Sequence, residues 1–120
     1  MINLLVLKET VDREKRVALV PDEIKKYLEL GFKVTIEKDA GIKSDFLNED
    51  YKKQNANISQ NIKESIKESD IIIKVQKPEP SIIKEIKAGT ILIGLLSPKK
   101  NSSENTLYNK KKVSAFALEN

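Results

Sequence analysis

The chain has 120 residues, enough for one domain with a sizeable core but few for an enzyme that also carries its own cofactor fold. It contains no Cys and no His, which excludes disulfides and thiolate chemistry and removes the commonest general base and metal ligand. The net charge of +4 includes one dense basic cluster, at 110–112, without aromatic residues arranged for stacking, so we expect no nucleic-acid partner.

The first half of the chain alternates apolar runs with helical patterns. The run at 4–7 predicts a strand that is buried on both faces, as parallel strands are. Pro21 predicts the start of a helix that Gly31 ends. The predicted buried stripe of this helix consists of Ile24, Tyr27, Leu28 and Leu30. The further predicted elements are a strand at 34–36, a turn-rich loop at 39–44, a short helix capped by Asn48 that carries Tyr51, and a weak strand at 56–58.

The second half continues the same alternation. Ser59 is predicted to cap a helix with Ile62 and Ile66 on one face, and 71–75 is the clearest β segment. The remaining predicted elements are a short helix at 81–87 closed by Gly89, a strand at 91–96, a helix at 103–108 and a last strand at 113–118. This alternation with short connections predicts an α/β fold with a doubly wound parallel sheet of the Rossmann or flavodoxin type.

Two arginines stand in the charged loop between the first strand and the first helix. They are Arg13 and Arg16, the only arginines among 22 basic residues. In open α/β sheets ligands bind beyond the carboxyl ends of the strands, where this loop lies. A planar guanidinium grips a carboxylate with two parallel hydrogen bonds, which indicates a geometric role. The alternative is an ion pair with Glu9, Asp12 or Glu14 on a solvated loop.

Lys74 and Ser97 are the other candidate residues. Lys74 lies inside an apolar strand, where an ammonium is a good partner for a carboxylate or carbonyl; the alternative is a lysine that snorkels to the strand end. Ser97 ends the strand at 91–96, but without a His it is a poor nucleophile, and hydrogen bonding or turn chemistry is the expected role. No glycine-rich phosphate fingerprint and no carboxylate cluster with metal-ligand spacing occur, so we expect this chain alone to bind neither NAD nor NADP, and no metal.

Three segments in register carry a family resemblance. The first is Lys8-Glu9-Thr10 followed by Arg16-Val17-Ala18-Leu19 and Pro21; the second is Ile73-Lys74-Val75-Gln76-Lys77-Pro78; the third is Gly89-Thr90-Ile91-Leu92 with Leu96. Together they resemble the N-terminal domain of the alanine dehydrogenase and pyridine nucleotide transhydrogenase family, over the whole chain. The second signature is usually lysine-valine-x-glutamate-proline, and this sequence departs from it at Gln76-Lys77.

The resemblance implies roles for these candidates. In alanine dehydrogenases the arginine matching Arg16 and the lysine matching Lys74 contact the carboxylate and carbonyl of the substrate, and a catalytic His ends the third strand. This sequence has Ser97-Pro98 at that point, which is similar to transhydrogenase α subunits, as is its ending at 115–120. We therefore assign no catalytic residue to this chain, and we expect Arg16, Lys74 and Ser97 to be ligand contacts.

For the whole protein, the resemblance implies that residues 1–120 are the first domain of a two-domain NAD-binding protein, truncated before the NAD-binding domain and inactive alone. The expected function is that of a proton-translocating NAD(P) transhydrogenase subunit α, which transfers hydride between NAD(H) and NADP(H). The expected partners are the NAD-binding domain of the same subunit, the NADP-binding and membrane domains, and a second copy in a homodimer. The expected location is cytoplasmic, at the inner face of the bacterial plasma membrane through the β subunit.

Two alternatives to a transhydrogenase remain open. One is an alanine dehydrogenase or a saccharopine-type oxidoreductase acting on an oxoacid or amino acid. The other is a stand-alone, non-catalytic binding module, against which an exposed apolar face for a missing domain would count.

Overall fold

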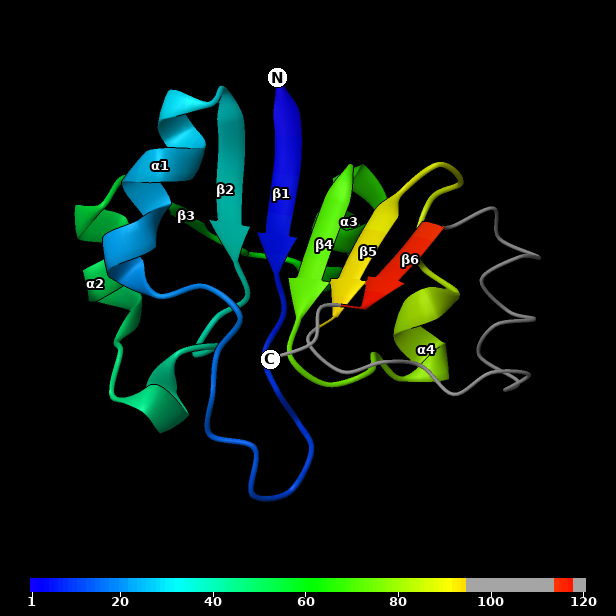
Figure 1. The fold of residues 1–120 in the computed structure, drawn as a ribbon, viewed down its shortest axis with the longest axis horizontal. Coiled ribbons are helices and arrows are strands. Elements are labelled where there is room, and N and C mark those ends of the chain that lie inside the picture. Colours follow the sequence, from blue (N-terminus) through cyan, green and yellow to red (C-terminus); the bar gives the residue numbers. More distant parts are fainter. Residues whose placement is uncertain (95–113, 118–120) are drawn as a thin grey trace.

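The computed structural model of the chain describes residues 1–94 and 114–117 (Figure 1). In this portion of the chain, six strands form one parallel sheet in the order β3-β2-β1-β4-β5-β6. The strands are β1 (Ile2–Val6), β2 (Phe32–Ile36), β3 (Asn57–Ile58), β4 (Ile71–Lys74), β5 (Ile91–Gly94) and β6 (Ser114–Ala117). The chain winds outward from β1 in one direction and then returns to add β4 on its other side. This reversal confirms the predicted doubly wound sheet, in the Rossmann strand order.

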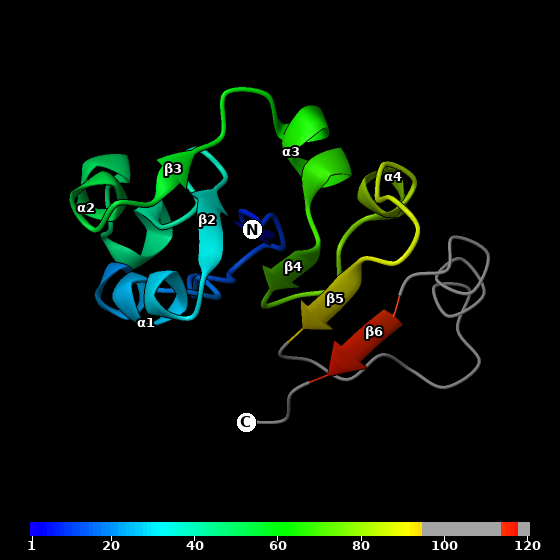
Figure 2. The ribbon, with the colours of Figure 1, turned by 90° about the horizontal axis from the view of Figure 1, so that it is seen from above.

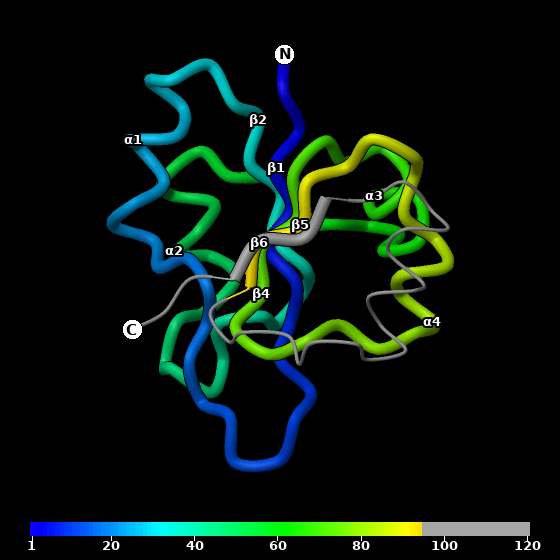
Figure 3. Tube along the Cα trace, turned by 45° about the vertical axis from the view of Figure 1, so that its right-hand side comes forward, coloured from blue at the N-terminus to red at the C-terminus, as the bar shows by residue number. Residues whose placement is uncertain are grey.

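Helices cover both faces of the sheet. They are η1 (Pro21–Glu23), α1 (Ile24–Glu29), η2 (Ile42–Ser44), α2 (Asn48–Lys53), α3 (Ile62–Glu68) and α4 (Pro80–Ile83). Seen from above, α1 and α2 lie on one face beside β1, β2 and β3, whereas α3 and α4 lie on the other face (Figure 2). The tube in Figure 3 shows the same division into two layers around the central strands.

β1 belongs to both cores. Leu4 and Val6 point into the cluster under α1 and α2, which also holds Ile24, Val34, Ile36 and Tyr51. Leu5 and Leu7 point into the cluster under α3 and α4, which also holds Ile66, Ile72, Ile83, Ile86 and Leu92. These four β1 and post-β1 side chains are at most 3% exposed, so the prediction of a strand buried on both faces is confirmed. Burying each such side chain stabilises the fold by about 1.5–3 kcal/mol.

The first helix is shorter than predicted, and Leu30 does not belong to its buried stripe. α1 ends at Glu29, and Leu30 is 72% exposed. At 100° per residue, Leu30 lies about 120° around the helix axis from Ile24 and therefore off the stripe. Gly31 follows with φ +93°, a conformation that glycine adopts without a Cβ penalty, so the predicted end signal is confirmed.

Two predicted caps were wrong. The cap of α3 is Asn61, whose side chain accepts a hydrogen bond from the backbone N–H of Glu64 at 3.2 Å, whereas the Ser59 hydroxyl pairs with the Ser65 hydroxyl at 2.7 Å. Asn48 is the first residue of α2 and not its cap. Its amide instead bridges to Asp39, accepting from the backbone N–H at 2.8 Å and donating to the carboxylate at 2.9 Å. Asn48 thereby holds the preceding loop.

The C-terminal elements are described only partially. α4 spans Pro80–Ile83, which is shorter than the predicted helix at 81–87, and Gly89 has the left-handed φ of +89° expected where a turn closes. β5 and β6 confirm the predicted strands within their described residues. The predicted helix at 103–108 and Ser97 lie outside the described residues. Within the described portion of the chain, no helix is long and apolar enough to cross a membrane.

Candidate functional site

Glu9 joins the loops that leave β1 and β4. Its carboxylate accepts hydrogen bonds from the Lys74 ammonium at 3.2 Å, from the backbone N–H of Val75 at 2.9 Å and from the backbone N–H of Gln76 at 2.9 Å. The side chains of Glu9 and Lys74 are 2% and 1% exposed. Because a buried carboxylate is costly without partners, this convergence of three donors explains how the charge is tolerated. The result is a clamp across the two central strands.

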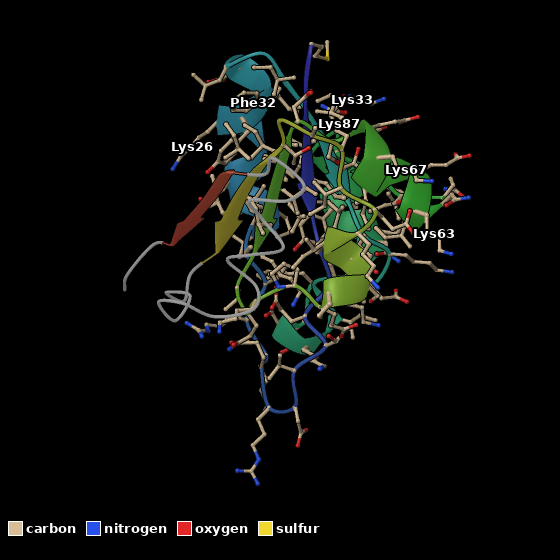
Figure 4. All side chains as sticks on the ribbon, turned by 90° about the vertical axis from the view of Figure 1, so that its right-hand side faces the viewer. Lys26, Phe32, Lys33, Lys63, Lys67 and Lys87 are labelled. Carbon is tan, nitrogen blue, oxygen red and sulfur yellow. The ribbon has the colours of Figure 1, made fainter. Side chains whose placement is uncertain are left out.

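Lys74 is buried, unlike the lysines on the surface. Those labelled in Figure 4, Lys26, Lys33, Lys63, Lys67 and Lys87, are all exposed. The snorkelling alternative does not describe Lys74, because its ammonium stays buried on Glu9. A ligand contact through Lys74 stays a prediction.

A second carboxylate, Glu14, organises Arg16. The Arg16 Nε and Nη2 donate to the two Glu14 carboxylate oxygens at 3.1 and 2.8 Å, and the Arg16 backbone N–H donates to Oε2 at 3.0 Å. Glu14 is 7% exposed, whereas the Arg16 side chain is 50% exposed. The Arg16 hydrogen bond lowers the pKa of Glu14 to about 2, so this carboxylate is ionised at neutral pH. Of the alternatives considered for the arginines, the ion pair of Arg16 with Glu14 is confirmed.

Gln76 connects the two carboxylates. Its side-chain amide nitrogen donates to Glu14 Oε1 at 2.6 Å, and its backbone N–H is one of the donors to Glu9. Gln76 follows β4 and Glu14 lies in the loop after β1, 62 residues apart along the chain. The series of hydrogen bonds from Glu9 through Gln76 and Glu14 to Arg16 therefore crosses the point at which the strand order reverses. In open α/β sheets this is the position of the ligand crevice.

The remaining polar contacts support the same rim. Glu37, which follows β2, accepts a hydrogen bond from the backbone N–H of Lys8 at 2.7 Å, and burial raises its pKa above the usual range. The Thr10 hydroxyl donates to Glu79 at 2.8 Å and ties the β1 loop to the loop before α4. Arg13 is exposed, has φ +68°, and lines a surface groove together with Glu14, Lys43 and Asp45.

The structure thus brings Arg16 and Lys74 to one rim of the sheet and links them through Glu14, Gln76 and Glu9. From the sequence, Glu9 and Glu14 stand out only as possible ion-pair partners of the arginines, and Gln76 only as a departure from a signature. One signal could have found Glu9: a carboxylate two residues after the apolar run at 4–7 can be drawn into the sheet rim and then needs a buried partner, and Lys74 is the only charged residue of β4. Among the described residues, no group of three acidic side chains is placed to hold a metal ion.

Comparison with known proteins gives consistent matches. The sequence matches the family described as alanine dehydrogenase/PNT, N-terminal domain, over residues 5–120. It is 36% identical over 122 residues to the first portion of the NAD(P) transhydrogenase subunit alpha of Rickettsia prowazekii, covering 98% of this chain and 32% of that protein. It is 40% identical over 91 residues to alanine dehydrogenase 1 of Staphylococcus aureus, covering 76% of this chain and 24% of that protein.

Solved structures of the same two kinds of protein match the fold. The transhydrogenase from Sinorhizobium meliloti superposes with a TM-score of 0.88 at 28% identity, covering 96% of this chain and 34% of that one. An L-alanine dehydrogenase superposes with a TM-score of 0.87 at 25% identity, covering 97% of this chain and 32% of that one. The chain therefore spans about a third of the length of the transhydrogenases it matches.

Proposed function

Because this chain belongs to the family of alanine dehydrogenase and transhydrogenase N-terminal domains, we propose that it forms the first domain of an NAD(P) transhydrogenase α subunit. In the complete enzyme it would supply one wall of the site in which hydride passes between NAD(H) and NADP(H). The observation that carries this assignment is a rim built around Arg16 in a chain without any His.

The missing His separates the two branches of the family. Reductive amination of an oxoacid needs a group that carries a proton near neutral pH, and neither Arg16 nor a lone Ser97 hydroxyl can do so. Hydride exchange between two nicotinamides moves no proton at the reacting carbon. The residues of this chain therefore support transhydrogenation over alanine dehydrogenation, while a saccharopine-type enzyme remains the other alternative.

The residues present fit the ring end of the cofactor and not its pyrophosphate. The glycines at 31, 41, 89 and 94 are isolated, so the chain offers no glycine-rich turn for phosphates. NAD(H) would supply the hydride and would be held mainly by a second domain. The role of this chain would be to orient the ring: Arg16 as a direct contact, and Lys74 as a residue that acts through Glu9. Ser97, which lies outside the described residues, is proposed as a hydrogen-bonding residue.

The proposed assembly follows from the relative's name. The Rickettsia protein is one portion of a divided subunit α, which supports an enzyme of several chains with a separate NADP-binding and membrane portion. We propose that the chain works on the cytoplasmic side of the membrane, joined to the NAD-binding domain of its own subunit and paired with a second copy.

Two chimeras test the proposed function. In the first, this chain replaces the matched third of the Rickettsia subunit, which is combined with the other chains of that transhydrogenase. We expect this chimera to reduce an NAD analogue with NADPH, and we expect Arg16→Ala to lower the rate at least tenfold. In the second, the chain replaces the matched segment of the S. aureus alanine dehydrogenase, and we expect negligible alanine-dependent reduction of NAD. A folded but inactive first chimera, or a robustly active second one, would overturn the assignment.

A further inference from the structure

Two cations at the switch point, Lys74 and Arg16, are paired with carboxylates of this chain. Lys74 is paired with Glu9 and Arg16 with Glu14, so these four charged side chains sum to zero. Lys77, the residue after Gln76, has an interaction of its own and does not enter this sum. A site that is built to capture an anion keeps a net positive charge for it, as a guanidinium or ammonium facing the ligand provides. The four charged side chains of the Glu9–Lys74 and Glu14–Arg16 pairs carry no net positive charge for an anion.

Two hydrogen-bonding groups of this network remain for a ligand: the outer N–H edge of Arg16 as a donor and the side-chain carbonyl of Gln76 as an acceptor. Glu14 occupies the Nε/Nη2 edge of Arg16, and the Arg16 Nη1 makes no hydrogen bond within the described portion of the chain. The orientation of the Gln76 amide is fixed, because Glu14 can only accept and so must face the Gln76 nitrogen. The Gln76 carbonyl oxygen is therefore left as an acceptor, on a side chain that donates to the same Glu14 oxygen as the half-exposed Arg16 guanidinium.

We propose that Arg16 and Gln76 together form a subsite for an uncharged primary carboxamide, such as that of a nicotinamide ring, and not for a free carboxylate. The carboxamide oxygen accepts from Arg16 and the carboxamide nitrogen donates to Gln76. Glu14 sets this selectivity by cancelling the charge of Arg16, and Glu9 acts as a positioning residue by holding the backbone of Gln76. The inference rests on the proposed function for the identity of the ligand, but its chemistry can be tested without turnover.

The test compares two ring compounds that differ only in this group. Nicotinamide and nicotinate are titrated separately into the 120-residue chain, and the NMR signals of the Arg16 Nε–H and the Gln76 side-chain amide are followed. We expect nicotinamide to shift these signals with a Kd on the order of 10 mM, as suits a fragment of this size, and nicotinate to bind at least about tenfold more weakly. Nicotinate binding as tightly as nicotinamide, or no shift with either compound up to about 50 mM, would overturn the proposal.

Variants separate selectivity from folding. Glu14→Gln removes the cancelling charge and is expected to strengthen nicotinate binding about tenfold. Glu29→Gln makes the same change of net charge at an exposed position and should leave both affinities unchanged. If Glu14→Gln does not fold, Gln76→Met provides the test: it leaves the Arg16–Glu14 pair in place but removes the acceptor, and nicotinamide should lose its advantage over nicotinate. Unchanged selectivity in either folded variant would contradict the proposal.

The outcome is distinguishable from that of the chimeras. Selective binding of nicotinamide with an inactive transhydrogenase chimera would leave the carboxamide subsite standing and refute the enzyme assignment. Preference for nicotinate together with an active chimera would refute the carboxamide subsite and leave the enzyme assignment standing.

Discussion

Replacing Glu9 with Gln tests the clamp between β1 and β4. Three donors converge on this carboxylate: Lys74 and the Gln76 backbone on Oε1, and the Val75 backbone on Oε2. A glutamine has the same shape but only one acceptor oxygen, so in either orientation its NH₂ group faces a donor. The change also removes the ion-pair partner of the Lys74 ammonium, whose side chain is 1% exposed.

The expected cost of Glu9→Gln is large. Removing one partner from a buried ion pair costs about 3–5 kcal/mol. The reciprocal change, Lys74→Met, fills a similar volume and leaves the Glu9 carboxylate with two backbone N–H donors, so we expect about 1–3 kcal/mol. The order of the two values, with Glu9→Gln costing more, is the prediction.

Urea unfolding followed by circular dichroism at pH 7 measures both values. Glu29→Gln, at an exposed site, is the control and should stay within about 0.5 kcal/mol of wild type. A cost below about 1 kcal/mol for Glu9→Gln, or a larger cost for Lys74→Met, would refute the reasoning, because either result would mean that Glu9 does not gather the three donors.

The network and the core support three further predictions. Arg16 holds the pKa of Glu14 near 2, below its unfolded value, so the ionised Glu14 stabilises the fold above about pH 4.5 and this stabilisation is lost as the pH falls toward 2. Because Arg16 is half-exposed, we expect the stabilisation to be about 1 kcal/mol. Urea unfolding measured across this pH range should show it in the wild type and not in Glu14→Gln. A Cβ on Gly41 would lie 2.8 Å from both the Phe46 Cβ and the Tyr51 hydroxyl oxygen, so Gly41→Ala should lower the free energy of unfolding by about 1–3 kcal/mol. A neutral result would show that both neighbours can move aside. Asn61→Ala removes the cap of α3 and should cost about 1 kcal/mol in the same assay, whereas Asn61→Asp, which restores an acceptor, should not.

The strands and their faces were predictable because they depend on local composition. A short apolar run such as that of β1 must be buried on both faces, and the alternation of Leu4 and Val6 with Leu5 and Leu7 assigns each side chain to a layer. The helix ends were less predictable, since Ser59 and Asn61 are both chemically able to cap, and only the path of the chain decides between them.

The site was predictable in its location and not in its connections. The pair of Arg16 with Glu14 spans two residues and was among the alternatives that the sequence offers. The pair of Lys74 with Glu9 spans 65 residues, and a single sequence does not say which distant carboxylate meets a buried lysine. Gln76 stands out in the sequence only as a departure from a family signature, because an uncharged amide gives no sign of its partners, although in the structure it joins both carboxylates.

The sharing of β1 between two cores has a consequence for synthesis on the ribosome. The partner on one side, β2, is made soon after β1, but the partner on the other side is not: Leu5 pairs in register with Ile72. At about 5–20 residues per second, that separation amounts to roughly 3–13 seconds in which Leu5 and Leu7 have no covering layer. Nascent chains in this interval expose a surface that chaperones bind. Of two substitutions on β1 with equal cost to the finished fold, the one on the late-covered face should therefore have the larger effect on the yield of folded protein.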